Sequence, residues 1–154
     1  THATVGGDEV KWITQPALVL SLAGGADDTY DGFLQMSEIF NLRLNADLVV
    51  LSACDTGKGK LRRGEGIVGL TRAFMYAGTH SVVASLWQVN DQSTSRFMEC
   101  FYRNLKEGQS KAEALRQAKK QLMQIQVWSD TLKKEQSFTA PFYWAPFILI
   151  GSGN

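Results

Sequence analysis

One cysteine in this chain stands where a nucleophile would be expected. Cys54 ends an apolar run, Ala-Asp-Leu-Val-Val-Leu-Ser-Ala-Cys at residues 46–54, and a Gly-rich segment follows it at residues 55–59. In an open α/β sheet, reactive groups lie beyond the carboxyl ends of the strands. A thiolate there attacks a carbonyl carbon, and a neighbouring base or imidazolium lowers the pKa of the thiol. The position equally allows Cys54 to be a small buried hydrophobic residue, which is the usual role of a free cysteine.

Such a thiol needs a histidine, and the chain has two. His80 lies in Gly-Thr-His-Ser at residues 78–81, where a second apolar run begins, so it belongs at the amino end of a parallel strand. A strand is roughly 20 Å long, which puts His80 out of reach of Cys54, and we interpret it as a surface turn residue. His2 precedes Cys54 by 52 residues. If a strand runs up to it, His2 emerges beside Cys54; the alternative is an unordered terminal residue.

Alternating strands and helices must position these residues. Apolar runs predict strands, helical periodicity predicts helices, and residues 126–139 are polar enough to predict a loop or frayed helix. Proline favours a sheet edge for the first strand and an edge or bulge for the last. The alternation predicts an α/β fold with a mostly parallel sheet and one domain over residues 1–154. Strands are expected at 16–22, 46–54, 81–89 and 144–151, and helices at 33–44, at 67–77, from a cap at Asp91 or Ser93 to 106, and from a Ser110–Glu113 capping box to 123.

The composition excludes several classes of partner. The 154 residues are 44% apolar and 20% charged, with a formal net charge of +1. That charge does not favour nucleic acid, and no apolar run approaches the ~18 residues of a membrane span. Cys54 and Cys100 form no disulfide framework and no C-x-x-C pair, which predicts a reducing, cytoplasmic location. Because the chain opens with Thr1-His2 and no initiator Met, we expect a fragment whose N-terminal strands are missing.

Two other chemistries are suggested by short motifs and then rejected. Asp55-Thr-Gly resembles the aspartic-protease triplet, but that reaction needs two carboxylates in an all-β fold. The spacing Gly59-x4-Gly64 resembles a phosphate loop, but Glu65 follows where Lys is required. A dinucleotide fingerprint fails because Arg62 stands where its third glycine belongs. Nucleotide binding is therefore not expected.

Several segments, in the same order, resemble the CHAT family. The resemblance covers nearly the whole chain. It implies a caspase-like three-layer sandwich, with a mostly parallel central sheet and helices on both faces, in the clan of caspases and separase. CHAT domains are often found C-terminal to tetratricopeptide repeats. The segments are Leu-Val-Val-Leu-Ser-Ala-Cys-Asp-Thr-Gly at 48–57, Gly-Glu-Gly-Ile-Val-Gly-Leu-Thr-Arg-Ala-Phe at 64–74, Ala-Gly at 77–78, Val-Val-Ala-Ser-Leu-Trp at 82–87, Phe-Tyr at 101–102, Ala-Glu-Ala-Leu-Arg-Gln-Ala at 112–118 and Tyr-Trp-Ala at 143–145 with Phe147.

The resemblance implies a cysteine endopeptidase with a Cys54–His2 dyad. The family's Thr-His-Gly motif matches residues 1–2, and its Ser-Ala-Cys-acid-Thr-Gly motif matches residues 52–57. The separation of the pair is close to the ~50 residues typical of caspases. The oxyanion hole would use the backbone N–H groups of Ala3 and Cys54. Ala3 departs from the family's Gly, and a positive φ at this position would strain it.

The resemblance also implies how a substrate would bind. An extended peptide would lie along residues 85–87 by β-augmentation, with Ser85 on that strand and Trp87 as a pocket wall or, equally, a core residue. Asp55 would favour a basic residue before the scissile bond or would cap the loop. The expected partners are a protein or peptide substrate and an N-terminal repeat or sensor region. No metal or organic cofactor is expected. The alternative function is a catalytically silent CHAT domain that acts as an interaction scaffold, and Cys100 is expected to be inert packing within a helix.

Overall fold

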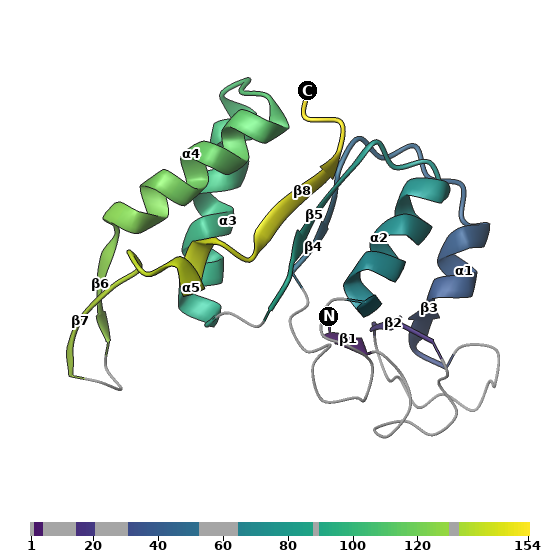
Figure 1. Ribbon diagram of the computed structural model, residues 1–154, viewed down its shortest axis with the longest axis horizontal. Helices are drawn as coiled ribbons and strands as arrows, with labels where there is room; N and C mark the ends of the chain where they lie inside the picture. Colours follow the sequence, from purple (N-terminus) through teal and green to yellow (C-terminus); the bar gives the residue numbers. More distant parts are fainter. Residues whose placement is uncertain (1, 5–14, 21–30, 53–64, 88–89, 130–132) are drawn as a thin grey trace. The chain divides into compact units, whose positions relative to one another are not determined.

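The computed structural model describes residues 2–4, 15–20, 31–52, 65–87, 90–129 and 133–154 (Figure 1). The chain divides into two compact units, Thr1–Gln88 and Val89–Asn154. Helices and strands are mixed in both units, which confirms the α/β class. No helix in the described residues is both long and apolar enough to cross a membrane.

The first unit begins with a small antiparallel sheet. Its strands are β1 (His2–Thr4), β2 (Ala17–Val19) and β3 (Phe33–Gln35), in the order β1-β2-β3. The strand predicted at 16–22 is present, but its predicted edge position is wrong, because β2 pairs with a strand on each side. Pro16 is compatible with this place because it precedes the first paired residue. Its carbonyl accepts a hydrogen bond from the Met36 N–H at 2.9 Å.

The helix predicted at 33–44 is present only in part. Residues 33–35 form β3, and the helix α1 occupies Met36–Asn41. Phe33 and Leu34 pair with β2 across the sheet, so their apolar side chains belong to a strand although their spacing also fits a helix. The carboxylate of Glu38 accepts from the backbone N–H of Gln35 at 2.7 Å and stabilises the start of the helix.

A parallel strand pair and a covering helix complete the first unit. β4 (Val49–Leu51) runs parallel to β5 (Ser81–Ser85), and every residue of β5 is buried. The helix α2 (Glu65–Tyr76) contacts both β5 and α1, and the Tyr76 ring meets Phe40 edge to face. Burial on both faces suits the small and apolar residues of β5, Ser-Val-Val-Ala-Ser. The buried apolar residues of β4, α2 and β5 are Leu51, Ile67, Leu70, Ala73, Phe74, Val82, Val83 and Ala84.

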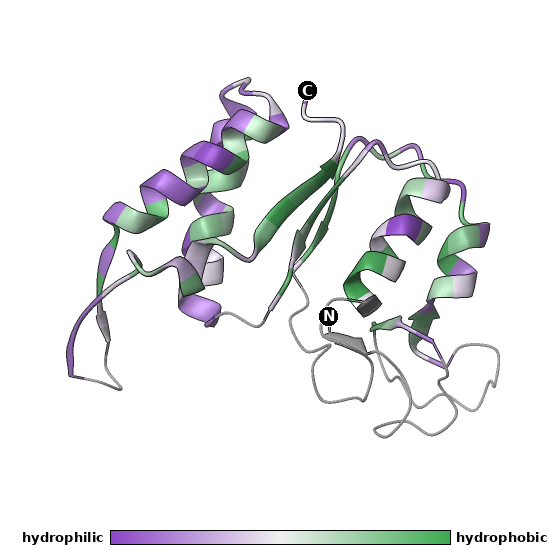
Figure 2. Cartoon of the chain, in the orientation of Figure 1, coloured by the Kyte–Doolittle hydropathy of each residue, from purple (hydrophilic) through white to green (hydrophobic). Residues whose placement is uncertain are grey.

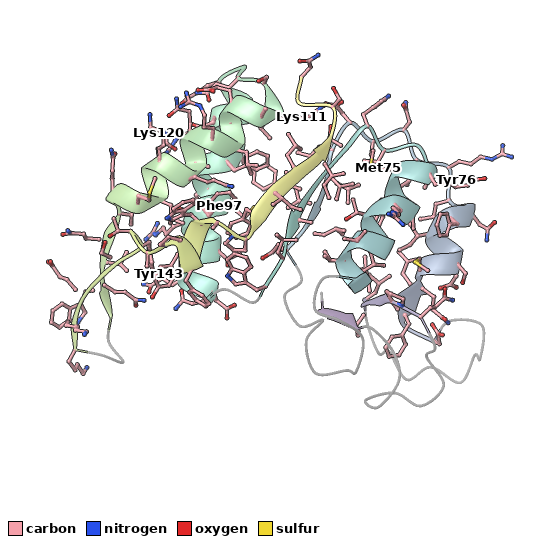
Figure 3. All side chains as sticks on the ribbon, viewed as in Figure 1. Met75, Tyr76, Phe97, Lys111, Lys120 and Tyr143 are labelled. Carbon is pink, nitrogen blue, oxygen red and sulfur yellow. The ribbon has the colours of Figure 1, made fainter. Side chains whose placement is uncertain are left out.

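The second unit is a helical pair with a hairpin and a final strand. Its elements are α3 (Asp91–Lys106), α4 (Lys111–Gln124), β6 (Gln126–Ser129), β7 (Lys134–Ser137), α5 (Pro141–Trp144) and β8 (Phe147–Gly151). The rings of Phe97 on α3 and Phe147 on β8 stack with centroids 3.9 Å apart, and both side chains are fully buried (Figure 3). Figure 2 shows β8 as a strongly hydrophobic strand.

The loop or frayed helix predicted at 126–139 is wrong, because these residues form the antiparallel hairpin β6–β7. The hairpin is polar because one of its faces lies in solvent, where Trp128 is paired with Glu135. On the other face, Val127 is paired with Gln136, whose amide donates to the Tyr143 hydroxyl at 2.9 Å. The last strand also begins later than predicted, because residues 141–144 form α5.

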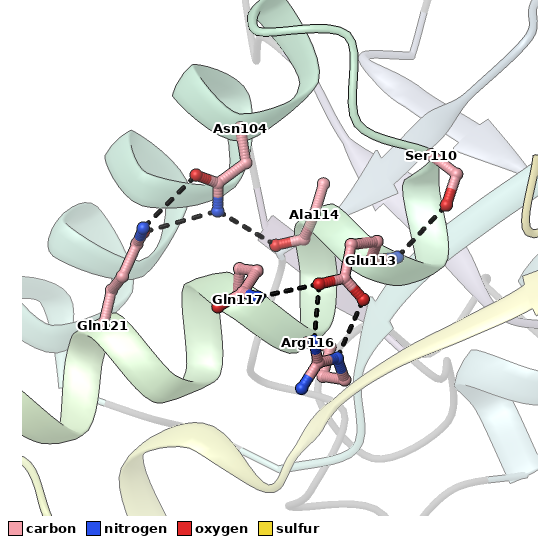
Figure 4. Close-up of polar contacts among 7 residues, drawn as sticks. All are labelled: Asn104, Ser110, Glu113, Ala114, Arg116, Gln117 and Gln121. Carbon is pink, nitrogen blue, oxygen red and sulfur yellow. Dashed lines mark hydrogen bonds and ion pairs between the residues drawn. The ribbon is translucent and has the colours of Figure 1, made fainter.

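Side chains cap both long helices of the second unit. The cap of α3 is Asn90 rather than Asp91 or Ser93: its Oδ1 accepts from the Ser93 N–H at 2.8 Å. The predicted cap of α4 is confirmed, since the Ser110 Oγ accepts from the Glu113 N–H at 3.4 Å (Figure 4). The Glu113 carboxylate accepts two hydrogen bonds from Arg116, at 2.6 and 2.8 Å, and one from Gln117 at 2.7 Å.

A buried amide pair joins α3 to α4. Asn104, 1% exposed, donates to the Ala114 carbonyl at 3.2 Å and to the Gln121 side chain at 3.3 Å, and it accepts from Gln121 at 3.4 Å (Figure 4). Because both amides find partners, the pair fixes one alignment of the helices without leaving a buried polar group unpaired.

Two glycines allow a matched test of backbone strain. Gly78 follows α2 with φ +107°, and a Cβ there would overlap the carbonyl oxygen of Leu44. Gly108 follows α3 with φ +86°, and a Cβ there would meet nothing within 4 Å. We expect Gly108→Ala to cost about 1 kcal/mol of unfolding free energy from positive φ alone, and Gly78→Ala roughly 3 kcal/mol because overlap adds to it. Urea denaturation measures both; equal losses would contradict the packing of Gly78 on Leu44.

The acidic side chain in the first turn of α4 predicts a pH dependence. Hydrogen bonds from Arg116 and Gln117 lower the pKa of Glu113 from 4.5 to about 2. A carboxyl with a lowered pKa stabilises the fold above its unfolded pKa and loses this contribution as pH falls toward the folded one. We therefore expect Glu113→Gln to be less stable than the wild type at pH 7, with the difference shrinking below about pH 4.5. Urea denaturation at pH 7, 5, 4 and 3 tests this. The control is Glu107→Gln, which removes another exposed carboxylate; the same pH dependence in both variants would argue against Arg116 as the cause.

Candidate active site

The carboxyl ends of β4 and β5 lie side by side. Their parallel register pairs Val49 with Val82 and Leu51 with Ala84, so both strands end at the same edge. Cys54 comes three residues after the end of β4, and Asp55 follows it. Both lie outside the described residues. The structure therefore gives the strand that leads to the predicted nucleophile, and the roles of Cys54 and Asp55 stay predictions.

Two predicted substrate-binding residues lie where β5 ends. Ser85 is the last residue of the strand and is 5% exposed. Its Oγ donates a hydrogen bond to the carbonyl oxygen of Trp87 at 2.8 Å. Trp87 itself is 39% exposed, so its side chain is not enclosed in a core. Ser85 was predicted within a strand at 81–89, but the strand ends at this residue. Its hydrogen bond was not predicted; the available signal was a serine two residues before an aromatic residue, because serine side chains often bond to nearby backbone groups.

The predicted general acid lies on β1. His2 is the first residue of this strand and pairs with Val19, whereas the sequence analysis placed it after a strand. In Figure 1, β1 lies toward the end of the first unit at which β4 and β5 finish. Ala3 is the middle residue of β1 and pairs with Leu18. Strand residues have negative φ, which alanine adopts without strain. The backbone strain that a positive φ would cause at Ala3 is therefore not expected in β1.

His80 is a surface residue at the opposite end of the parallel pair, which confirms its interpretation as a turn residue. It directly precedes β5, its N–H donates to the Ala46 carbonyl at 3.2 Å, and its side chain is 66% exposed. Its Nδ1 lies 4.0 Å from a carboxylate oxygen of Asp47, which is also exposed. Such an exposed contact contributes little to stability.

Cys100 is packed inside the second unit, as predicted. It is 4% exposed on α3, and the Arg103 guanidinium donates to its sulfur at 3.5 Å. A thiol in this position is protected from reagents unless the helix opens locally. Cys100 is therefore an internal reference against which the reactivity of Cys54 can be measured.

Comparison with known proteins identifies the family. The model of the CHAT domain matches residues 1–152. The chain belongs to the CHAT domain family. It is 34% identical over 119 residues to tetratricopeptide repeat protein 28 of Mus musculus and 33% identical over 119 residues to that of Homo sapiens. Each alignment covers 77% of this chain and 4% of the relative, so this CHAT domain spans only a small part of the length of the curated relatives it matches.

The two cysteines of the CHAT domain should differ in reactivity. We expect iodoacetamide to modify Cys54 in the native protein at least about 100-fold faster than Cys100, because Cys100 reacts only after local opening. Peptide mapping by mass spectrometry gives both rates in one sample. The same reaction in 6 M urea is the control, where the two rates should converge. Equal rates in the native protein would contradict an activated Cys54.

Proposed function

We propose that this CHAT domain is a cysteine endopeptidase that cleaves proteins or peptides with Cys54 as the nucleophile and His2 as the acid–base partner. The observation that carries the proposal is the family match over residues 1–152, a range that contains both His2 and Cys54. The parallel pairing of β4 with β5 supports it, because Cys54 follows the carboxyl end of a parallel strand, where α/β enzymes place their reactive groups.

The reaction follows from these groups. The Cys54 thiolate attacks the scissile carbonyl carbon, and the oxyanion that forms is stabilised by the N–H groups of Ala3 and Cys54. His2, protonated, gives its proton to the leaving amine as the C–N bond breaks. His2, now neutral, takes a proton from water, which attacks the thioester carbon. The C–S bond then breaks and releases the acid product and the thiolate.

The substrate would bind as an additional strand at the end of β5. An extended peptide that continues along residues 85–87 would pass beside the residues that follow β4, because the two strands end together. The exposed Trp87 supports a side-chain subsite there. Asp55 would favour a basic residue before the scissile bond.

We further propose that residues 1–154 form a single CHAT domain, a three-layer sandwich with a mostly parallel sheet, and that the protein is cytoplasmic. We also propose that a repeat or sensor region in the same polypeptide regulates cleavage, which the names of the relatives support.

The alternative is a CHAT domain without activity that serves as a scaffold. The relatives support it to the extent that their names describe tetratricopeptide repeats and no protease. The two functions make different demands on residues 2 and 54, since a scaffold needs neither side chain.

Peptide cleavage separates the two functions. We would incubate the protein and its Cys54→Ala, His2→Ala and His80→Ala variants with a mixed peptide library and identify the products by mass spectrometry. Cleavage should fall about 1,000-fold or more without either member of the dyad, because each acts in the rate-limiting chemistry. His80→Ala is the matched control, because it removes a histidine from the opposite end of the strand pair, and its cleavage should stay within about twofold of the wild type. Retained cleavage in Cys54→Ala would refute the proposed nucleophile. No cleavage, with Cys54 no more reactive than Cys100, would favour the scaffold.

A further inference from the structure

The buried Ser85 side chain forms a hydrogen bond across the bend that follows β5. Ser85 is 5% exposed, and its hydroxyl donates to the Trp87 carbonyl oxygen at 2.8 Å. The bond spans only two residues, so it holds the backbone of residues 85–87 in a bend where the strand ends. A hydrogen bond from a buried donor competes little with water, and its loss would leave the local backbone with fewer restraints.

This hydrogen bond restrains the backbone that carries the solvent-exposed ring of Trp87. Trp87 is 39% exposed, whereas the serine that holds its backbone is almost fully enclosed. The strand that carries Ser85 is buried at every residue, so the anchor is rigid while the anchored ring is accessible. An exposed ring on a restrained backbone loses less entropy when a ligand packs against it than a ring on a mobile backbone would.

We infer that Ser85 is a positioning residue for substrate binding: its hydroxyl acts through the Trp87 backbone to orient the indole ring and does not itself touch the substrate. This inference rests on the proposed function. It assigns to Ser85 a part in binding and none in bond cleavage, because the hydroxyl is buried and is already bonded to Trp87. Loss of the hydroxyl should therefore raise KM and leave kcat nearly unchanged.

The position of Trp87 is tested without any need for activity. The protein has four tryptophans, so labelling with 5-fluorotryptophan gives four ¹⁹F resonances, and Trp87→Phe assigns one of them. Ser85→Ala should shift or broaden the Trp87 resonance and leave the other three unchanged, which also shows that the fold is intact. Ser85→Thr keeps the hydroxyl and should restore the signal. The matched control is Ser81→Ala, which removes a fully buried serine hydroxyl from the other end of the same strand.

Kinetics on a fluorogenic peptide chosen from the cleavage products tests the consequence. We expect Ser85→Ala to raise KM roughly three- to tenfold, with kcat within about twofold, and Ser85→Thr to recover the wild-type values. An unmoved Trp87 resonance in Ser85→Ala would overturn the inference whether or not the protein cleaves peptides. An unchanged KM, or a fall in kcat alone, would also overturn it. A moved resonance in a protein that cleaves nothing, and whose Cys54 reacts no faster than Cys100, would favour the scaffold and still support the anchoring of Trp87.

Discussion

The parallel pairing of β4 with β5 is the constraint on which the candidate site depends. Its register sets Leu51 beside Ala84, so the segment after β4 and the segment after β5 begin at the same edge of the sheet. The first leads to Cys54, and the second, which begins after Ser85, carries Trp87. Because every residue of β5 is buried, a register slip of one residue would set each of its side chains against new neighbours in a close-packed core, which opposes the slip. The apolar core under α2 therefore fixes the geometry that the proposed chemistry needs.

Sequence patterns predicted the elements that have one strong local signal. The helices at 65–76, 91–106 and 111–124 have apolar periodicity and a cap or a terminal glycine, and the strand at 81–85 has the apolar run Val-Val-Ala at its centre. The errors occur where pairing with a distant segment decides the structure. Residues 33–35 became a strand because β2 lies beside them, and residues 126–137 became a hairpin although their composition is polar. Tertiary pairing of this kind is not encoded in local propensity.

For the candidate site too, the sequence predicted some features and missed others. The sequence was sufficient to choose Cys54 over Cys100, because Cys54 follows a predicted strand whereas Cys100 lies within a helix, and the burial of Cys100 agrees with that choice. It also placed Ser85 and Trp87 on a strand at 81–89, whereas the strand ends at Ser85 and Trp87 follows it. It did not predict the bond between them, since a serine at a strand end has many possible acceptors and only the bend of residues 85–87 selects one.

The direction of the strand pair also bears on which histidine could act as the acid–base partner of a thiol at Cys54. His80 enters β5 at the end opposite to the one that Cys54 follows, and the five residues of β5 separate the two ends by about 16 Å. A general acid must lie within hydrogen-bond reach of the atom it protonates. Of the two histidines in this sequence, His2 is therefore the one that the proposed chemistry at Cys54 would use. The proposed protease function therefore depends on His2, which lies on β1, and on Cys54, which follows β4 in the sequence.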